Sequence, residues 1–239
     1  MNFNYQMRFS KTGRARFIAH LDTLSCLMRA IRRAGYELAE TQGMRPKPLL
    51  SLAMPLGVGV EGEDEICDFS LKQRAPLAEL AKQLNGELPQ GMELKSVGPT
   101  FDRTKAASRV ASVSYRIELA DAPAALDEAI ARYNGLGDYV LVRRRPKGDK
   151  EVDLKKYIRT VDLAEGPAPA LGFRMAVTPE GTGRPEEIIE ALGSLAGAPL
   201  SASRIIRTAI GIEEEAQPST RPGRRPRPQM RRPAGRKRR

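Results

Sequence analysis

The feature that most constrains the fold of this chain is a β-strand pattern followed by an α-helix pattern. Residues 4–10 alternate apolar and polar side chains, which is the two-residue period of a half-buried β-strand. Residues 21–31 then place apolar side chains at steps of three and four, which predicts one apolar helix face that ends at Gly35. A second helix is expected at 76–84, and further strands at 36–40, 49–53, 66–71 and 92–97. With the middle connection elaborated, this is the β-α-β-β-α-β order of a ferredoxin-like unit.

The second half of the chain repeats the order without strong identity between the halves. Strands are expected at 113–119, 139–143, 173–177 and 204–212, and helices at 122–133 and 185–195. The sequence therefore predicts an α+β protein with two tandem ferredoxin-like units, residues 1–103 and 108–215. A disordered basic tail, residues 216–239, follows them.

The C-terminal tail carries almost all of the excess charge. It holds ten basic residues, no acidic residue and no aromatic residue, whereas the formal net charge of the whole chain is +11. Such a segment buries too little apolar surface to offset its ordering entropy. Because cations along a chain release counterions from a polyphosphate, we expect salt-sensitive binding to nucleic acid. The alternative is a solubilising tail without a partner.

The composition leaves few catalytic chemistries open. His20 is the only histidine, and Cys26 and Cys67 are the only cysteines, so no metal and no cofactor is predicted. The N-terminus has no secretory apolar region, and no run of apolar residues is long enough to cross a membrane. We therefore expect a cytoplasmic protein without a membrane partner.

Clusters of basic residues are the candidate nucleic-acid contacts. One cluster lies on the first strand and the turn after it, a second in a loop stiffened by Pro46 and Pro48, a third on the strand at 139–143, and a fourth in the tail. The loop could instead be a structural crossover, and the third cluster a solvated hairpin. The candidates are Arg8, Lys11, Arg14, Arg16, Arg45, Lys47, Arg143, Arg145, Arg224, Arg225, Arg231 and Arg232.

His20 is the candidate catalytic residue. CRISPR repeat-processing endoribonucleases have a similar tandem plan and can use a histidine in this region, whose pKa suits proton transfer. The alternative is a structural histidine bonded to Asp22 or to the backbone. Residues 57–62 match the letters of the motif G-x-G-x-x-G. A dinucleotide site needs a helix directly after this motif, but acidic residues and a strand follow here, so only the letters match.

Three stretches carry a resemblance to a known family: residues 8–22, 42–48 and 55–61. The sequence resembles radical-SAM-linked proteins of unknown function, which are encoded beside or fused to a cobalamin-type radical SAM protein. The resemblance implies a radical SAM partner and a role in RNA modification. Family members often carry an aromatic residue and histidines after Gly43, where this chain has Met44, Arg45 and Lys47. The chain lacks the C-x-x-x-C-x-x-C motif, so it is not itself the radical enzyme.

Three functions follow as hypotheses. The first is a non-catalytic RNA-binding accessory protein that presents structured RNA to a radical SAM enzyme. The second is a metal-independent endoribonuclease that uses His20. The third is a protein-binding adaptor that makes no contact with RNA.

Overall fold

The computed structural model describes residues 2–102, 104–146, 148–166 and 168–213, and within them the chain is an α+β protein built on one large sheet. Four α-helices are described: α1 (His20–Arg33), α2 (Leu77–Glu87), α3 (Leu126–Gly135) and α4 (Pro185–Ala196). The strands of the first half are β1 (Phe3–Lys11), β2 (Leu50–Leu52), β3 (Glu61–Leu71) and β4 (Met92–Pro99). Those of the second half are β5 (Val110–Leu119), β6 (Val140–Arg143), β7 (Lys150–Asp153), β8 (Asp162–Ala164), β9 (Ala170–Thr178), β10 (Gly181–Thr182) and β11 (Ala202–Ile212). The α+β class predicted from the sequence is confirmed.

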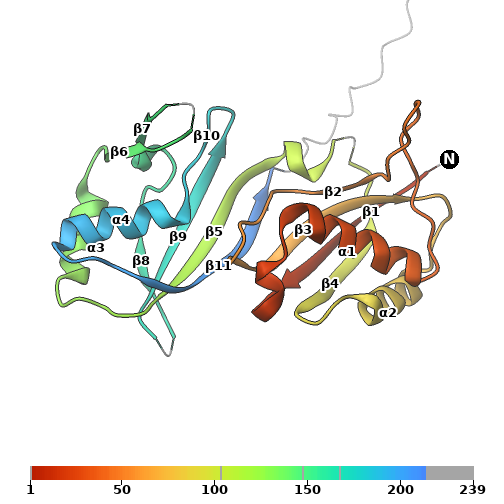
Figure 1. The fold of residues 1–239 in the computed structure, drawn as a ribbon, viewed down its shortest axis with the longest axis horizontal. Coiled ribbons are helices and arrows are strands. Elements are labelled where there is room, and N and C mark those ends of the chain that lie inside the picture. The colour runs from red at the N-terminus through yellow and green to blue at the C-terminus, as the bar shows by residue number, and fades with distance from the viewer. Residues whose placement is uncertain (1, 103, 147, 167, 214–239) are drawn as a thin grey trace, which may run out of the picture.

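The first half follows the predicted order of elements closely. β1 pairs antiparallel with both β3 and β4, and β2 pairs antiparallel with β3, so the strands lie in the order β4-β1-β3-β2. The apolar face of α1 supplies Leu27 and Ile31 to a core that also buries Met7 of β1 and Leu80 of α2. Figure 1 shows α1 and α2 at one end of the molecule and α3 and α4 at the other.

The second half departs from the prediction at β6. β5 pairs antiparallel with β9 and β11, but β6 pairs only with β7 in a separate two-stranded sheet. The free side of β9 is taken by β8, by an isolated bridge from Ile158 and by β10. The side chains of Val140 and Val142 are exposed because β6 has no place in the main sheet. The predicted tandem of two ferredoxin-like units is therefore not confirmed.

The two halves share one sheet and part of one core. β11 of the second half pairs in parallel with β3 of the first half, at Ile206–Glu61 and Arg207–Gly62. The apolar core around α3 and α4 also buries Leu56 and Ile66 from the first half. The domain division at residues 103–108 stays a prediction, but strand pairing and core packing cross it.

Other differences are local. The strand predicted at 36–40 forms only isolated bridges, and β3 begins five residues earlier than the predicted strand, at Glu61. Gly62 therefore lies in a strand and not in a loop. The tail lies outside the described residues. No described helix is long and apolar enough to cross a membrane.

Candidate functional site

The corner between β1 and α1 holds the first cluster of predicted cations and His20. The chain leaves β1 through Gly13, whose φ of +57° favours glycine, and forms the short 3-10 helix Gly13–Phe17. α1 then begins at His20. This turn places basic side chains of both β1 and the 3-10 helix next to β3, where acidic residues are concentrated.

Lys11 is buried within the fold instead of reaching solvent. Its residue surface is only 1% exposed, and Nζ donates a hydrogen bond of 2.6 Å to the carbonyl oxygen of Ile18. Burial lowers the pKa of Lys11 because it disfavours the charged amine, although the Glu65 carboxylate acts in the opposite direction. The bond joins the end of β1 to the start of α1, so Lys11 shapes the corner from inside.

Two further predicted cations are paired with carboxylates of β3. Arg8 forms an ion pair with Asp64, and Arg16 donates a hydrogen bond of 2.9 Å to Glu61. Both pairs hold the predicted basic strand and turn against the rest of the sheet. Their charge is thus largely neutralised within the fold.

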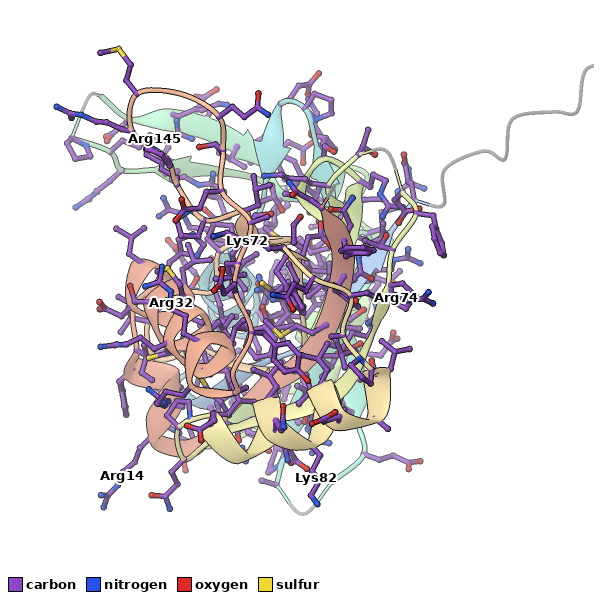
Figure 2. The ribbon with its side chains drawn as sticks, turned by 90° about the vertical axis from the view of Figure 1, so that its right-hand side faces the viewer. Arg14, Arg32, Lys72, Arg74, Lys82 and Arg145 are labelled. Carbon is purple, nitrogen blue, oxygen red and sulfur yellow. The ribbon has the colours of Figure 1, made fainter. Side chains whose placement is uncertain are left out.

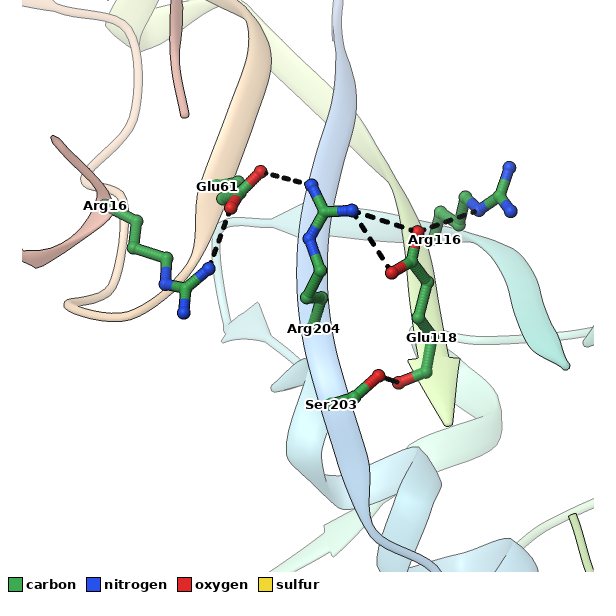
Figure 3. Close-up of polar contacts among 6 residues, drawn as sticks. All are labelled: Arg16, Glu61, Arg116, Glu118, Ser203 and Arg204. Carbon is green, nitrogen blue, oxygen red and sulfur yellow. Dashed lines mark hydrogen bonds and ion pairs between the residues drawn. The ribbon is translucent and has the colours of Figure 1, made fainter. Parts of the chain in front are cut away.

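Glu61 is the centre of a charged network that spans both halves (Figure 3). It accepts hydrogen bonds from Arg16 and from Arg204 of β11, and Arg204 also reaches Glu118 of β5. Burial alone raises the pKa of the Glu61 carboxyl, but the hydrogen bonds from Arg204 and Arg16 outweigh it and hold the pKa below its ordinary value. The carboxylate therefore stays charged and links the corner to β11.

A second ion pair lies deeper where β11 meets β3, which we call the junction of the two halves. Arg207 of β11 and Glu65 of β3 have side chains only 1% and 3% exposed, and Arg207 Nε donates a hydrogen bond of 2.8 Å to Glu65 Oε1. The guanidinium also donates to the backbone oxygens of Met54 and Pro55. A Cβ at Gly62 would lie 2.5 Å from Glu65 Oε1, so glycine there leaves room for the buried carboxylate.

We call the accessible part of this corner the corner surface: Arg14, Arg16, Phe17, His20, Leu21 and Val58. Phe17 is 59% exposed, and the Arg16 guanidinium lies over its ring at 4.9 Å from the ring centre. Arg14 is exposed and forms no ion pair with any described carboxylate, and Figure 2 shows its side chain projecting away from the body. The backbone oxygen of Arg16 accepts a hydrogen bond from Gly59, which brings Val58 beside this surface. The result is an exposed aromatic ring among cations.

His20 is half-buried at the first position of α1. Its Nδ1 atom is buried and has no hydrogen-bond partner among the described residues. A catalytic histidine is normally oriented by a group bonded to one ring nitrogen while the other nitrogen transfers the proton. Neither the bond to Asp22 nor a backbone bond is present at Nδ1.

The loop and hairpin clusters lie far from the corner surface and from each other. Arg45 and Lys47 are exposed in the loop before β2, which Figure 1 shows at the opposite end of the molecule from the β6–β7 hairpin. Arg143 is not free, because it donates hydrogen bonds of 2.6 and 2.7 Å to Glu187, and these raise its pKa. Arg145 is exposed. The four tail candidates Arg224, Arg225, Arg231 and Arg232 lie outside the described residues.

The predicted cations therefore do not form one surface. Sequence reasoning also missed Glu61, Glu65, Arg204 and Arg207, which tie the halves together. The only signal of these four residues in the sequence is the run of acidic residues at positions 61, 63 and 65. Acids at every second position are unusual in a strand this buried.

Residues 4–185 match the model of the family described as "Uncharacterized protein conserved in bacteria (DUF2344)". The chain belongs to this family. The family's description names no activity, cofactor or partner, so the radical SAM link is still a prediction. No curated protein matches the sequence.

Two of the solved structures that resemble this chain do so at low identity. One is a chain of a Cbf5-Nop10-Gar1 complex, which matches 88% of this chain with 10% identity and a TM-score of 0.49. The match spans only 50% of that chain. The other is an unknown protein from Galdieria sulphuraria, matched over 84% of this chain and 99% of that one, with 11% identity and a TM-score of 0.27. Both are too distant to support an argument about function.

Proposed function

We propose that this protein is a non-catalytic RNA-binding accessory protein that presents structured RNA to a radical SAM enzyme. The corner surface is the observation that carries the proposal. An exposed aromatic ring with a guanidinium over its face offers a base a stacking surface, and Arg14 beside it offers a phosphate a free cation. Both groups belong to a short segment that is held in place by the Lys11 and Glu61 contacts.

The cations of the folded body and those of the tail support an RNA interaction in two parts. Lys11 is buried and Arg8, Arg16 and Arg143 are paired, so the folded body offers an RNA only a few free cations near any one place. The ten basic residues of the tail would supply the remaining attraction, which is independent of sequence and sensitive to salt. The body would then orient the RNA through the corner surface.

The radical SAM partner is the part of the proposal that rests on the resemblance of residues 8–22, 42–48 and 55–61. Copurification with a radical SAM protein encoded in the same genome tests it directly. Recovery of RNA without that protein would support RNA binding and contradict the radical SAM partnership.

Deletion of the tail tests RNA binding. We expect residues 1–215 to bind RNA more weakly than the full chain, with a flatter dependence of the logarithm of affinity on the logarithm of salt concentration. If five tail cations contact single-stranded phosphates, the slope should fall by about 3.5. The measurement is a fluorescence anisotropy titration at several salt concentrations.

Equal affinities of the two proteins at low salt would contradict the role of the tail. A cleavage assay of the purified protein in EDTA and RNA crosslinking in cells separate the other hypotheses. Cleavage that is lost in His20→Ala would favour the endoribonuclease. Crosslinking in cells that recovers a protein but no RNA would favour the adaptor.

A further inference from the structure

A large cavity in the described part of the chain lies away from the corner surface. It has a volume of about 870 Å³ and is formed where β1 begins, β4 ends and the chain enters α2. Its lining includes Phe3, Tyr5, Arg74, Leu77, Pro99 and Phe101, and we call it the Phe101 pocket. Cavities of this size that combine apolar and aromatic walls with few polar groups are typical ligand sites.

The backbone around the pocket is held by contacts from neighbouring segments. The backbone N–H of Ala75 donates a hydrogen bond of 2.9 Å to the Tyr5 hydroxyl, and the Tyr5 ring stacks on Phe69. The N–H of Thr100 donates to the Asn4 carbonyl at 3.0 Å. These bonds fix two sides of the pocket, so a ligand would meet a preformed site.

The pocket leaves a large aromatic side chain in solvent. Phe101 is 91% exposed and Leu77 is 42% exposed. The segment that carries Phe101 is anchored on both sides, by the Thr100 bond and by an ion pair between Asp102 and Arg109. An anchored, exposed ring beside an apolar cavity is the arrangement of a stacking surface.

The charge at the pocket favours an anionic ligand. Arg74 is the one charged side chain in the lining, and it forms no ion pair with a described carboxylate. In Figure 2 it reaches outward on the opposite side of this end from Arg14 and Arg32. A phosphate bound there would leave an attached ring free to enter the pocket.

Glu213, the last residue described before the tail, is linked by contacts to the segment that carries Phe101. The backbone N–H of Glu213 donates a hydrogen bond to the Arg109 carbonyl, and Arg109 pairs with Asp102, the neighbour of Phe101. Residues 216–239, with their ten cations, begin three positions after Glu213. A nucleic-acid strand attracted by the tail would therefore be concentrated next to the Phe101 pocket.

We propose that the Phe101 pocket binds the base of an unpaired nucleotide in single-stranded RNA, with its phosphate on Arg74. The base stacks on Phe101, and the adjacent apolar wall excludes water from its second face. This inference rests on the proposed RNA-binding function and adds a substrate preference to it, since a base in a duplex cannot enter the pocket without being unpaired.

The test uses the full chain and a short single-stranded oligoribonucleotide that contains one 2-aminopurine. We expect Phe101→Ala to lower its affinity by about 5- to 150-fold, because a base that stacks on an aromatic side chain gains about 1–3 kcal/mol. The change in 2-aminopurine fluorescence on binding should be lost as well. Arg74→Gln should also weaken binding, whereas Lys82→Gln, an exposed cation on α2, should not.

The outcomes separate this inference from the proposed function. If the unchanged protein binds RNA and Phe101→Ala binds the single strand equally well, the pocket assignment is wrong and RNA binding stands. If the unchanged protein binds no RNA, both are wrong. If Phe101→Ala loses a protein partner but no RNA affinity, the pocket is a protein-docking site. Thermal unfolding of each variant checks that the fold is retained, as the exposure of Phe101 leads us to expect.

Discussion

Arg204 and Arg207 lie on the same strand and bind buried carboxylates of the same partner strand, yet one arginine is largely exposed and the other is buried. The Arg207 side chain is 1% exposed and its partner Glu65 is 3% exposed, whereas the Arg204 side chain is 44% exposed above Glu61. Arg207 also donates hydrogen bonds to two backbone oxygens, whereas Arg204 donates to two carboxylates, those of Glu61 and Glu118. The buried pair therefore belongs to the core of the junction, and the outer pair to its surface.

The same two properties, burial and a carboxylate partner, divide the other cations of the chain into groups. Lys11 and Arg207 are bonded in the interior, and Arg8, Arg16, Arg143 and Arg204 are paired at or near the surface. Arg14, Arg74 and the cations of the loop and hairpin are exposed without a described carboxylate partner, and so are others scattered over separate elements, such as Arg32, Lys82 and Arg159. A positive charge in the sequence is thus no evidence of a binding surface until its partner is known.

The largest effect is expected at the buried pair. Arg207→Met leaves Glu65 buried without its partner, and breaking such a pair costs about 3–5 kcal/mol of unfolding free energy. The double change Arg207→Met with Glu65→Leu removes both charges and should recover a large part of that loss. Urea unfolding measures both values. A single variant as stable as the unchanged protein would contradict the structural role of the pair.

A smaller, pH-dependent effect is expected at the outer pair. The pKa of Glu61 is depressed in the folded state, so its contribution is complete above the unfolded pKa near 4.5 and disappears as the pH falls through the folded pKa. Arg204→Gln should cost about 1.5–3 kcal/mol at neutral pH, because it removes a hydrogen bond to the buried Glu61 carboxylate, which keeps the bond from Arg16.

The same variant should also lose less stability than the unchanged protein between neutral pH and the region below pH 4.5. Urea unfolding across that range provides the measurement. An unchanged pH profile in Arg204→Gln would mean that Glu61 does not depend on this arginine.

The local elements could be predicted from the sequence because their signals are local. The three- and four-residue spacing of Leu24, Leu27 and Ile31 gives α1 directly, and the alternation around Met7 gives β1. The same alternation at residues 139–143 predicts a strand correctly but not its partner. β6 pairs with β7, whereas β8 and β10 occupy the free side of β9.

The junction could not be predicted because its partners are far apart along the chain. Glu65 and Arg207 are separated by 142 positions, and Glu61 and Arg204 by 143. A single sequence shows that these residues are charged but not that they meet. For the same reason, Arg8 and Arg16 look like free surface cations until Asp64 and Glu61 are placed beside them.

The RNA affinity of a full-length variant with Arg14→Gln and Phe17→Ala tests whether the corner surface binds RNA. Its matched control carries Arg159→Gln and Leu163→Ala, which remove an exposed cation and an exposed apolar side chain from the second half. We expect the corner variant to bind RNA at least about fivefold more weakly, as the loss of one stacked base predicts, and the control to bind like the unchanged protein. Equal affinities of the two variants would contradict the assignment of the corner surface to RNA.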